Sequence, residues 1–124
     1  MKNSKILNIA LSLIMLFSIL AFPASAASRI IDVYDEADLL TDSEESKLID
    51  SVTEDYGNAL DINIIFVTTD DADGKSTQAY ADDYYDELTE KQSEYSGILF
   101  LIDMDNREIT ISTAGNCITW FNDD

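Results

Sequence analysis

Carboxylates are the side chains through which this sequence could do chemistry. Among its 124 residues it has 25 Asp and Glu, a single cysteine and no histidine. The absence of histidine excludes Ser-His-Asp and Cys-His catalysis and every His-based zinc site. We interpret Cys117 as a small packing residue, because no histidine can activate it, and as the only cysteine it cannot form an intramolecular disulfide. Any chemistry must come from Asp and Glu, which act as general acids or bases and bind hard cations.

One acidic loop has part of the pattern of a calcium-binding EF-hand. Residues 69–74 read Thr-Asp-Asp-Ala-Asp-Gly. If Gly74 is the sixth position of such a loop, the first is Thr69 and the twelfth is Tyr80, so the bidentate acid at position twelve is missing. We interpret this segment as a turn before a helix.

A second pattern imitates a phosphatase site. Asp103-Met104-Asp105 follows an apolar run, as does the aspartate-x-aspartate nucleophile site of haloacid dehalogenase-type phosphatases. That mechanism also needs a lysine on a later loop, and no lysine follows Asp103. The pattern lacks its supporting context, so we set it aside.

The first 26 residues have the composition of a secretory signal peptide. Lys2 and Lys5 give a positive start, residues 6–22 are mostly apolar, and residues 23–26 form a small-residue cleavage pattern. The alternative is an uncleaved membrane anchor, which the polar residues within the apolar stretch weaken. We therefore predict a leader over residues 1–26 and a secreted or cell-envelope location.

The remaining residues, 27–124, are expected to form one strongly acidic domain. The full chain has a formal net charge of −18, and loss of the leader removes two of its seven Lys and Arg but no acidic residue. Such a charge excludes nucleic acid as a partner, and it excludes a membrane contact except through the leader or a downstream helix. Cations or basic partners fit this charge better.

The domain alternates between strand and helix patterns. Apolar residues at helical spacing predict helices over about 42–56 and 76–91, and apolar or β-branched runs predict strands that start at Ile30 and cover 62–68, 97–102 and 108–113. The run 97–102 lacks alternation, as is typical of a central parallel strand, whereas 108–113 alternates and should pair back as a hairpin near an edge.

Helix ends and one aromatic stripe add detail. Thr41 and Glu44 have the pattern of a capping box, and Gly57 stands where a left-handed C-cap would follow the first helix. In the second helix, Tyr80, Tyr84 and Leu88 share one face. We interpret these tyrosines as packing residues whose hydroxyl groups reach water.

Several of these features, in this order, resemble the TPM domain family. They are the segment Val33-x-Asp35-x-Ala37-x-x-Leu40, the strand 97–102, Arg107 in a turn, the strand 109–113 and Gly115. The resemblance implies an α/β fold: a small three-layer Rossmann-like sandwich with a mixed, mostly parallel sheet, helices on both faces and the order βαβαββα. It also implies a further helix and strand, so we expect the domain to be incomplete at its C-terminus. One departure is Asn106, where family members often have an aspartate.

The same resemblance implies a divalent cation, notably calcium, as a ligand. Carried over by position, the metal ligands are Asp35, Asp103 or Asp105, and Asp123. Loops at the carboxyl ends of parallel strands converge, and a hard cation relieves the repulsion between carboxylates gathered there. The alternative is that an acidic surface places aspartates in turns without a shared site.

We therefore expect an exported, calcium-binding accessory or interaction module at the cell envelope, with an envelope protein as a candidate partner. Two alternatives stay open. One is a weak metal-dependent acid phosphatase, an activity that the resemblance implies for some members. The other is an inactive fragment of a longer, membrane-anchored protein. The scarcity of Lys and Arg, which bind phosphate esters, favours binding over hydrolysis.

Overall fold

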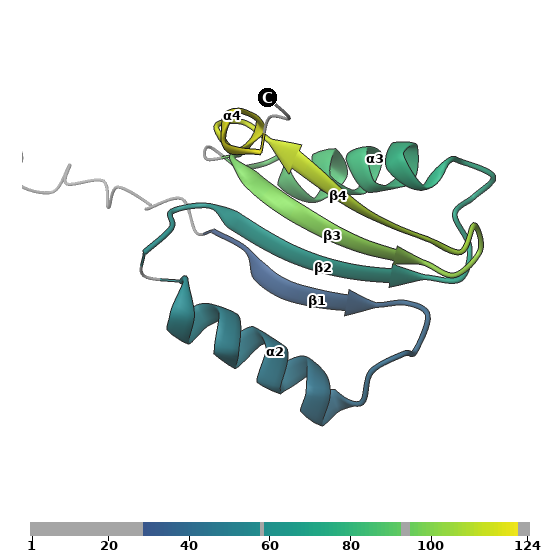
Figure 1. Ribbon diagram of the computed structural model, residues 1–124, viewed down its shortest axis with the longest axis horizontal. Helices are drawn as coiled ribbons and strands as arrows, with labels where there is room; N and C mark the ends of the chain where they lie inside the picture. The colour runs from purple at the N-terminus through teal and green to yellow at the C-terminus, as the bar shows by residue number, and fades with distance from the viewer. Residues whose placement is uncertain (1–28, 58, 93–94, 122–124) are drawn as a thin grey trace, which may run out of the picture.

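A single mixed sheet forms the centre of the protein. The computed structural model describes residues 29–57, 59–92 and 95–121. The elements along the chain are β1 (Ile31–Asp35), α2 (Asp42–Asp55), β2 (Asn63–Thr69), α3 (Thr77–Thr89), β3 (Gly97–Asp103), β4 (Glu108–Ala114) and α4 (Cys117–Trp120) (Figure 1). The strand order is β1-β2-β3-β4, with β1 to β3 parallel and β4 antiparallel to β3. The predicted α/β class and element order are confirmed, while the predicted leader lies outside the described residues.

A side-chain cap begins each of the two long helices. Thr41 caps α2 as predicted: its side chain accepts a hydrogen bond from the Glu44 amide, and the Glu44 carboxylate accepts one from the Thr41 amide. Ser76 caps α3 by accepting a hydrogen bond from the Ala79 amide. None of the helices in the described ranges is long and apolar enough to cross a membrane.

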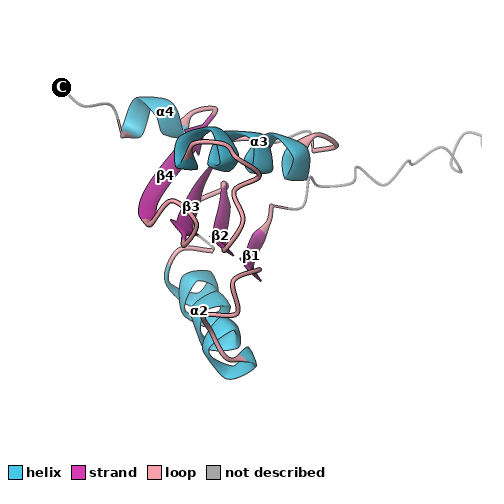
Figure 2. Cartoon of the chain, turned by 90° about the vertical axis from the view of Figure 1, so that its right-hand side faces the viewer, coloured by secondary structure: helices cyan, strands magenta, loops and turns pink. Residues whose placement is uncertain are grey.

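The two long helices lie on opposite faces of the sheet (Figure 2). Ile65 packs in the cluster that includes Tyr85 of α3, whereas its neighbour Ile64 packs with Val52 of α2. The crossovers from β1 to β2 and from β2 to β3 step in the same direction, so two right-handed crossovers would place both helices on one face. One of the two crossovers is therefore left-handed, and each face receives one long helix.

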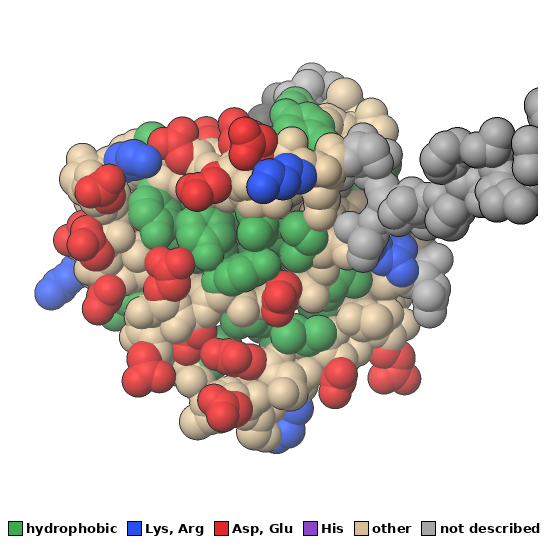
Figure 3. All heavy atoms as spheres, turned by 180° about the vertical axis from the view of Figure 1, so that it is seen from behind, with side chains coloured by type: hydrophobic (Ala, Val, Ile, Leu, Met, Phe, Trp, Pro, Cys, Tyr) green, Lys and Arg blue, Asp and Glu red, His purple; other side chains and the backbone are tan. Residues whose placement is uncertain are grey.

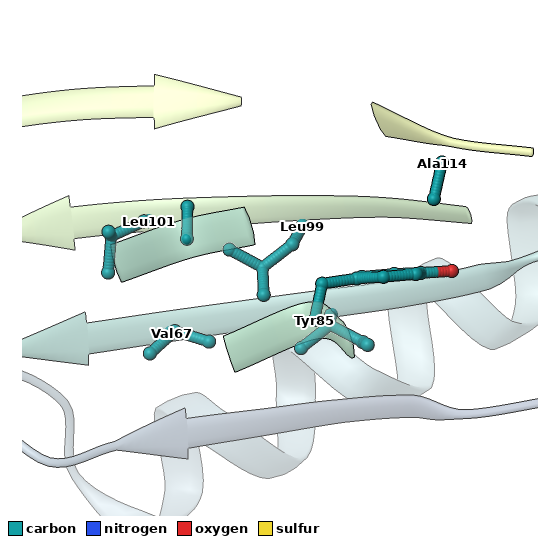
Figure 4. Packing of buried hydrophobic residues seen from close by; sticks show 7 residues of the cluster. Val67, Tyr85, Leu99, Leu101 and Ala114 are labelled. Carbon is teal, nitrogen blue, oxygen red and sulfur yellow. The ribbon is translucent and has the colours of Figure 1, made fainter. Parts of the chain in front are cut away.

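The main core lies between α3 and the sheet. Figure 4 shows Tyr85 of α3 beside side chains from β2, β3 and β4. The Tyr85 hydroxyl donates to the Tyr95 carbonyl (2.6 Å) and accepts from the Asn63 side chain (3.2 Å). A Cβ on Gly97 would lie 2.3 Å from that hydroxyl oxygen, so glycine is required there for close packing. The buried members of this core are Ile65, Val67, Ala81, Tyr85, Leu99, Leu101 and Ala114.

Candidate functional site

The loops that follow β1, β2 and β3 meet at the carboxyl edge of the parallel strands. The Glu36 amide donates to the Thr68 carbonyl (3.1 Å) and the Met104 amide to the Thr69 carbonyl (2.8 Å). The Ala72 amide donates to Asp105 Oδ2 (3.2 Å), which ties the loop after β2 to the loop after β3. The predicted ligands Asp35, Asp103 and Asp105 all lie along this edge.

Asp35 organises the turn that leaves β1. Its carboxylate accepts hydrogen bonds from the Thr68 hydroxyl, the Leu40 amide (2.7 Å) and the Leu39 amide (3.1 Å). The Thr68 bond, and next the two amides, lower the pKa of Asp35 against the opposing effect of burial. Asp35 therefore holds the segment that leads into the cap of α2, with both oxygens engaged.

Asp103 is the buried carboxylate of this edge, with 1% of its surface exposed. It accepts hydrogen bonds from the Thr77 hydroxyl (2.8 Å) and from the Asn106 amide (3.0 Å) and side chain (2.8 Å). Burial by itself raises the pKa of Asp103, but these hydrogen bonds outweigh it and the pKa lies below its usual value. The carboxylate thus fastens the start of α3 to the end of β3.

Asn106 and Thr77 are the members of this edge that sequence reasoning missed. Asn106 donates twice to Asp103 and once to the Lys75 carbonyl (3.1 Å). The sequence offered one signal: an asparagine three residues after an aspartate, in a turn, is placed to bridge the loop. The Asn106 side chain donates to Asp103 and to the Lys75 carbonyl, which an aspartate carboxylate could not do.

The structure does not gather the predicted ligands into one cluster. Asp35 of β1 pairs in register with Thr68 of β2, and Asp103 of β3 pairs with Thr69 of β2. Because β2 lies between them, the backbones of β1 and β3 are roughly 10 Å apart. Asp105 accepts its bond from Ala72, and Asp123 lies outside the described residues. Within the described ranges, no three or more Cys, Asp or Glu side chains are placed to hold a metal ion.

The described residues therefore do not by themselves fit a closed calcium site. Asp35 and Asp103 each accept three hydrogen bonds from neighbouring loop, strand and helix residues, so few of their lone pairs are free. Calcium binding stays a prediction.

Cationic side chains are scarce at this edge. In the described part of the chain the ion pairs are Arg29 with Asp61 (3.8 Å) and Lys75 with Asp83 (2.9 Å). Neither includes a predicted ligand, and Arg107, in the turn after β3, belongs to neither pair. The negative charge of the edge is balanced by hydrogen-bond donors rather than by basic side chains.

Cys117 has the packing role that the sequence indicated. It is fully buried beside Ile64 and Ile98, and burial raises the pKa of its thiol. A thiol held neutral in an apolar cluster is a poor nucleophile.

Comparison with known proteins identifies a family to which this chain is similar, and a curated relative. Residues 33–124 match the family model described as the TPM domain. The chain is also similar to the UPF0603 protein YdjH of Bacillus subtilis (strain 168), with 31% identity over 109 residues. The matched region covers 87% of this chain and 41% of that relative. The chain thus spans less than half of the length of the relative.

Proposed function

Because this chain belongs to the TPM domain family, we propose that it is an exported accessory module that works by binding cationic partners. The observation that carries this proposal is the convergence of three acidic loops at one edge of the sheet, where no ion pair of the described residues neutralises the predicted ligands. An acidic edge of this kind concentrates cations and basic partners near its surface. The composition and the N-terminal leader pattern support an envelope location.

Calcium is the divalent cation that we propose for this edge. It accepts irregular oxygen geometry completed by water, which suits carboxylates spread over separate loops. The predicted set needs Asp123 in addition to Asp35, Asp103 and Asp105, and their commitment to loop hydrogen bonds favours weak over tight binding.

Binding ranks ahead of phosphate-ester hydrolysis for a reason visible at Asp103. A catalytic carboxylate must reach the substrate or a water molecule. Asp103 is 1% exposed and is saturated by Thr77 and Asn106, so its visible role is to hold the loop. We therefore do not assign it a catalytic role.

A calcium titration followed by thermal unfolding tests the metal part of the proposal. We expect the melting temperature to rise with calcium concentration, because a ligand that binds only the folded state stabilises it by about 2.7 kcal/mol at 100 times its Kd. The double variant Asp35→Asn with Asp123→Asn should lose the calcium-dependent rise. Asp50→Asn, an exposed change on α2, is the matched control and should keep the rise.

Two results would contradict parts of this proposal. An unchanged melting temperature in calcium, with folded and monodisperse protein, would remove calcium as the ligand. Chelator-sensitive hydrolysis of an aryl phosphate would move the chain from the binding proposal to the phosphatase alternative.

A further inference from the structure

A cavity beside the acidic edge has the lining of a site for organic cations. It has a volume of about 630 Å³, within the range of small-ligand sites. It lies between the turn after β1 and the C-terminal half of α3. Its lining residues are Glu36, Tyr84, Glu87, Leu88, Glu90 and Lys91. Three carboxylates thus face one ammonium group beside an aromatic ring and a leucine.

The aromatic wall of the cavity belongs to a cluster of three tyrosines. The Tyr84 ring lies 5.9 Å from that of Tyr34 at 64° and 5.9 Å from that of Tyr80 at 35°. The Tyr80 and Tyr84 hydroxyls donate to the two oxygens of Glu36, each at 3.1 Å. Glu36 therefore fixes the positions of both hydroxyl groups. Tyr84 also lines the cavity, so a cation held there by the carboxylates can make a cation–π contact with this ring.

The protonation states at this wall suit a cation. Burial, and next the charge of Glu36, raise the pKa of the Tyr84 hydroxyl, so both tyrosines remain neutral donors at physiological pH. Neither ion pair of the described residues involves Glu36, Glu87, Glu90 or Lys91. The lining keeps an excess of negative charge.

One face of the molecule combines apolar and acidic side chains. Figure 3, the view opposite to Figure 1, shows hydrophobic side chains gathered in the middle of one face with acidic side chains around them. Tyr34, Tyr80, Tyr84 and Leu88 are only partly buried against the core. An arginine side chain matches this combination, because its apolar stem covers hydrophobic surface while its guanidinium stacks on tyrosine and bonds to carboxylates.

We propose that this cavity binds an arginine side chain of an extended, basic segment of a partner protein, with the guanidinium among Glu36, Glu87 and the Tyr84 ring. The inference rests on the proposed function and gives it a defined face and a partner chemistry. It requires no calcium.

Fluorescence anisotropy with a labelled Gly-Ser peptide that carries two arginines tests the proposal. Glu36→Gln should weaken binding by roughly tenfold or more, as expected for a lost hydrogen bond to a charged group. Tyr84→Leu should weaken it roughly threefold, through the lost cation–π contact. Glu54→Gln on the exposed surface of α2 removes the same charge and should change binding less than about twofold. Replacement of arginine by neutral citrulline should abolish binding by the unaltered protein.

Several outcomes would overturn the inference. Equal weakening by Glu36→Gln and Glu54→Gln would mean diffuse charge attraction, which leaves the proposed function intact but removes this site. Equal binding of the citrulline peptide would do the same. If choline binds more tightly than the arginine peptide, the ligand of this cavity is a small organic cation and not a segment of a protein. If no basic peptide binds and calcium has no effect, the proposed function fails as well. Thermal unfolding of each variant confirms that the variant is folded. If Tyr84→Leu does not fold, Glu36→Gln alone still tests the site.

Discussion

The two faces of the sheet are completed to very different extents. On one face, α3 buries Thr77, Ala81, Tyr85 and Thr89. On the other face, α2 has no buried residue. Hydrogen bonds also fasten α3 to β4, from Ser112 to Asp82 (2.6 Å) and from Thr110 to Gln78 (2.9 Å). The α3 face therefore holds the packing that fixes the fold, whereas α2 lies at its margin.

The α2 face of β2 to β4 is apolar but only partly covered: Ile64 and Ile98 are buried, whereas the apolar residues of this face toward the carboxyl ends of β2 and β3 are not. Phe66 and Phe100 stack there, with ring centroids 5.1 Å apart. Ile102, Ile109 and Ile111 continue the same face and are 39%, 75% and 54% exposed. The contrast shows how the alternating residues of β4 relate to α3. The polar residues of β4, Thr110 and Ser112, face α3 and bond to it, whereas the isoleucines of β4 point to the opposite face of the sheet.

The largest expected effect contrasts two apolar truncations. Leu99→Ala on the α3 face should lower the free energy of unfolding by about 3 kcal/mol, because it leaves a cavity in a fully buried core. Ile111→Ala on the α2 face should lower it by less than about 1 kcal/mol, because half of that side chain already contacts water. Urea unfolding of both variants measures the difference. Equal losses would contradict the unequal faces.

The next effect tests the buried carboxylate on the α3 face. Asp103→Asn should cost about 2 kcal/mol, because an amide places a donor opposite the donors of Thr77 and Asn106. The pKa of Asp103 is lowered in the folded protein, so its contribution is present above the unfolded pKa near 4 and is lost as pH falls through the folded pKa. Urea unfolding from pH 7 to pH 3 should therefore show a smaller loss of stability below pH 4 for Asp103→Asn than for the unaltered protein. Parallel curves would contradict this role of Asp103.

The sequence was sufficient for the elements but not for the site. Local signals such as the Thr41–Glu44 capping box and the apolar run of β3 depend on near neighbours, and both predictions are confirmed. Gly57 is a local failure: it lacks a left-handed φ, and glycine is needed because a Cβ would lie 2.4 Å from the Thr53 carbonyl oxygen. The prediction that the tyrosines of α3 pack against the core is confirmed. That two of their hydroxyls meet on Glu36 could not be predicted, because this contact joins residues more than forty positions apart. The hydrogen bond from Thr77 to Asp103 also joins residues far apart in the sequence, so it could not be predicted either.

A smaller effect separates the two helices by their caps. Thr41→Ala should cost about 1 kcal/mol and should speed amide exchange throughout α2, since that helix has no buried residue to hold it once the cap is lost. Ser76→Ala removes the corresponding cap of α3 but should speed exchange only in its first turn, because Ala81 and Tyr85 anchor the rest. Hydrogen–deuterium exchange measures both variants. Faster exchange throughout α3 in Ser76→Ala would show that α3 depends on its cap as much as α2 does.

The smallest effect on stability concerns the open α2 face itself. Ile109→Thr should change the free energy of unfolding by less than about 0.5 kcal/mol, because the side chain is 75% exposed and threonine keeps its β-branch. The same change removes apolar surface from an edge strand, where exposed apolar residues favour association between copies. Light scattering at high concentration and high salt, where the repulsion between acidic chains is screened, should therefore show less association for Ile109→Thr than for the unaltered protein. Glu108→Gln is the matched control on the same strand: it leaves the isoleucines in place and removes one negative charge, so it should not reduce association. A loss of stability above 1 kcal/mol in Ile109→Thr would mean that this face is packed in the folded protein, which would break the contrast between the two sides of the sheet.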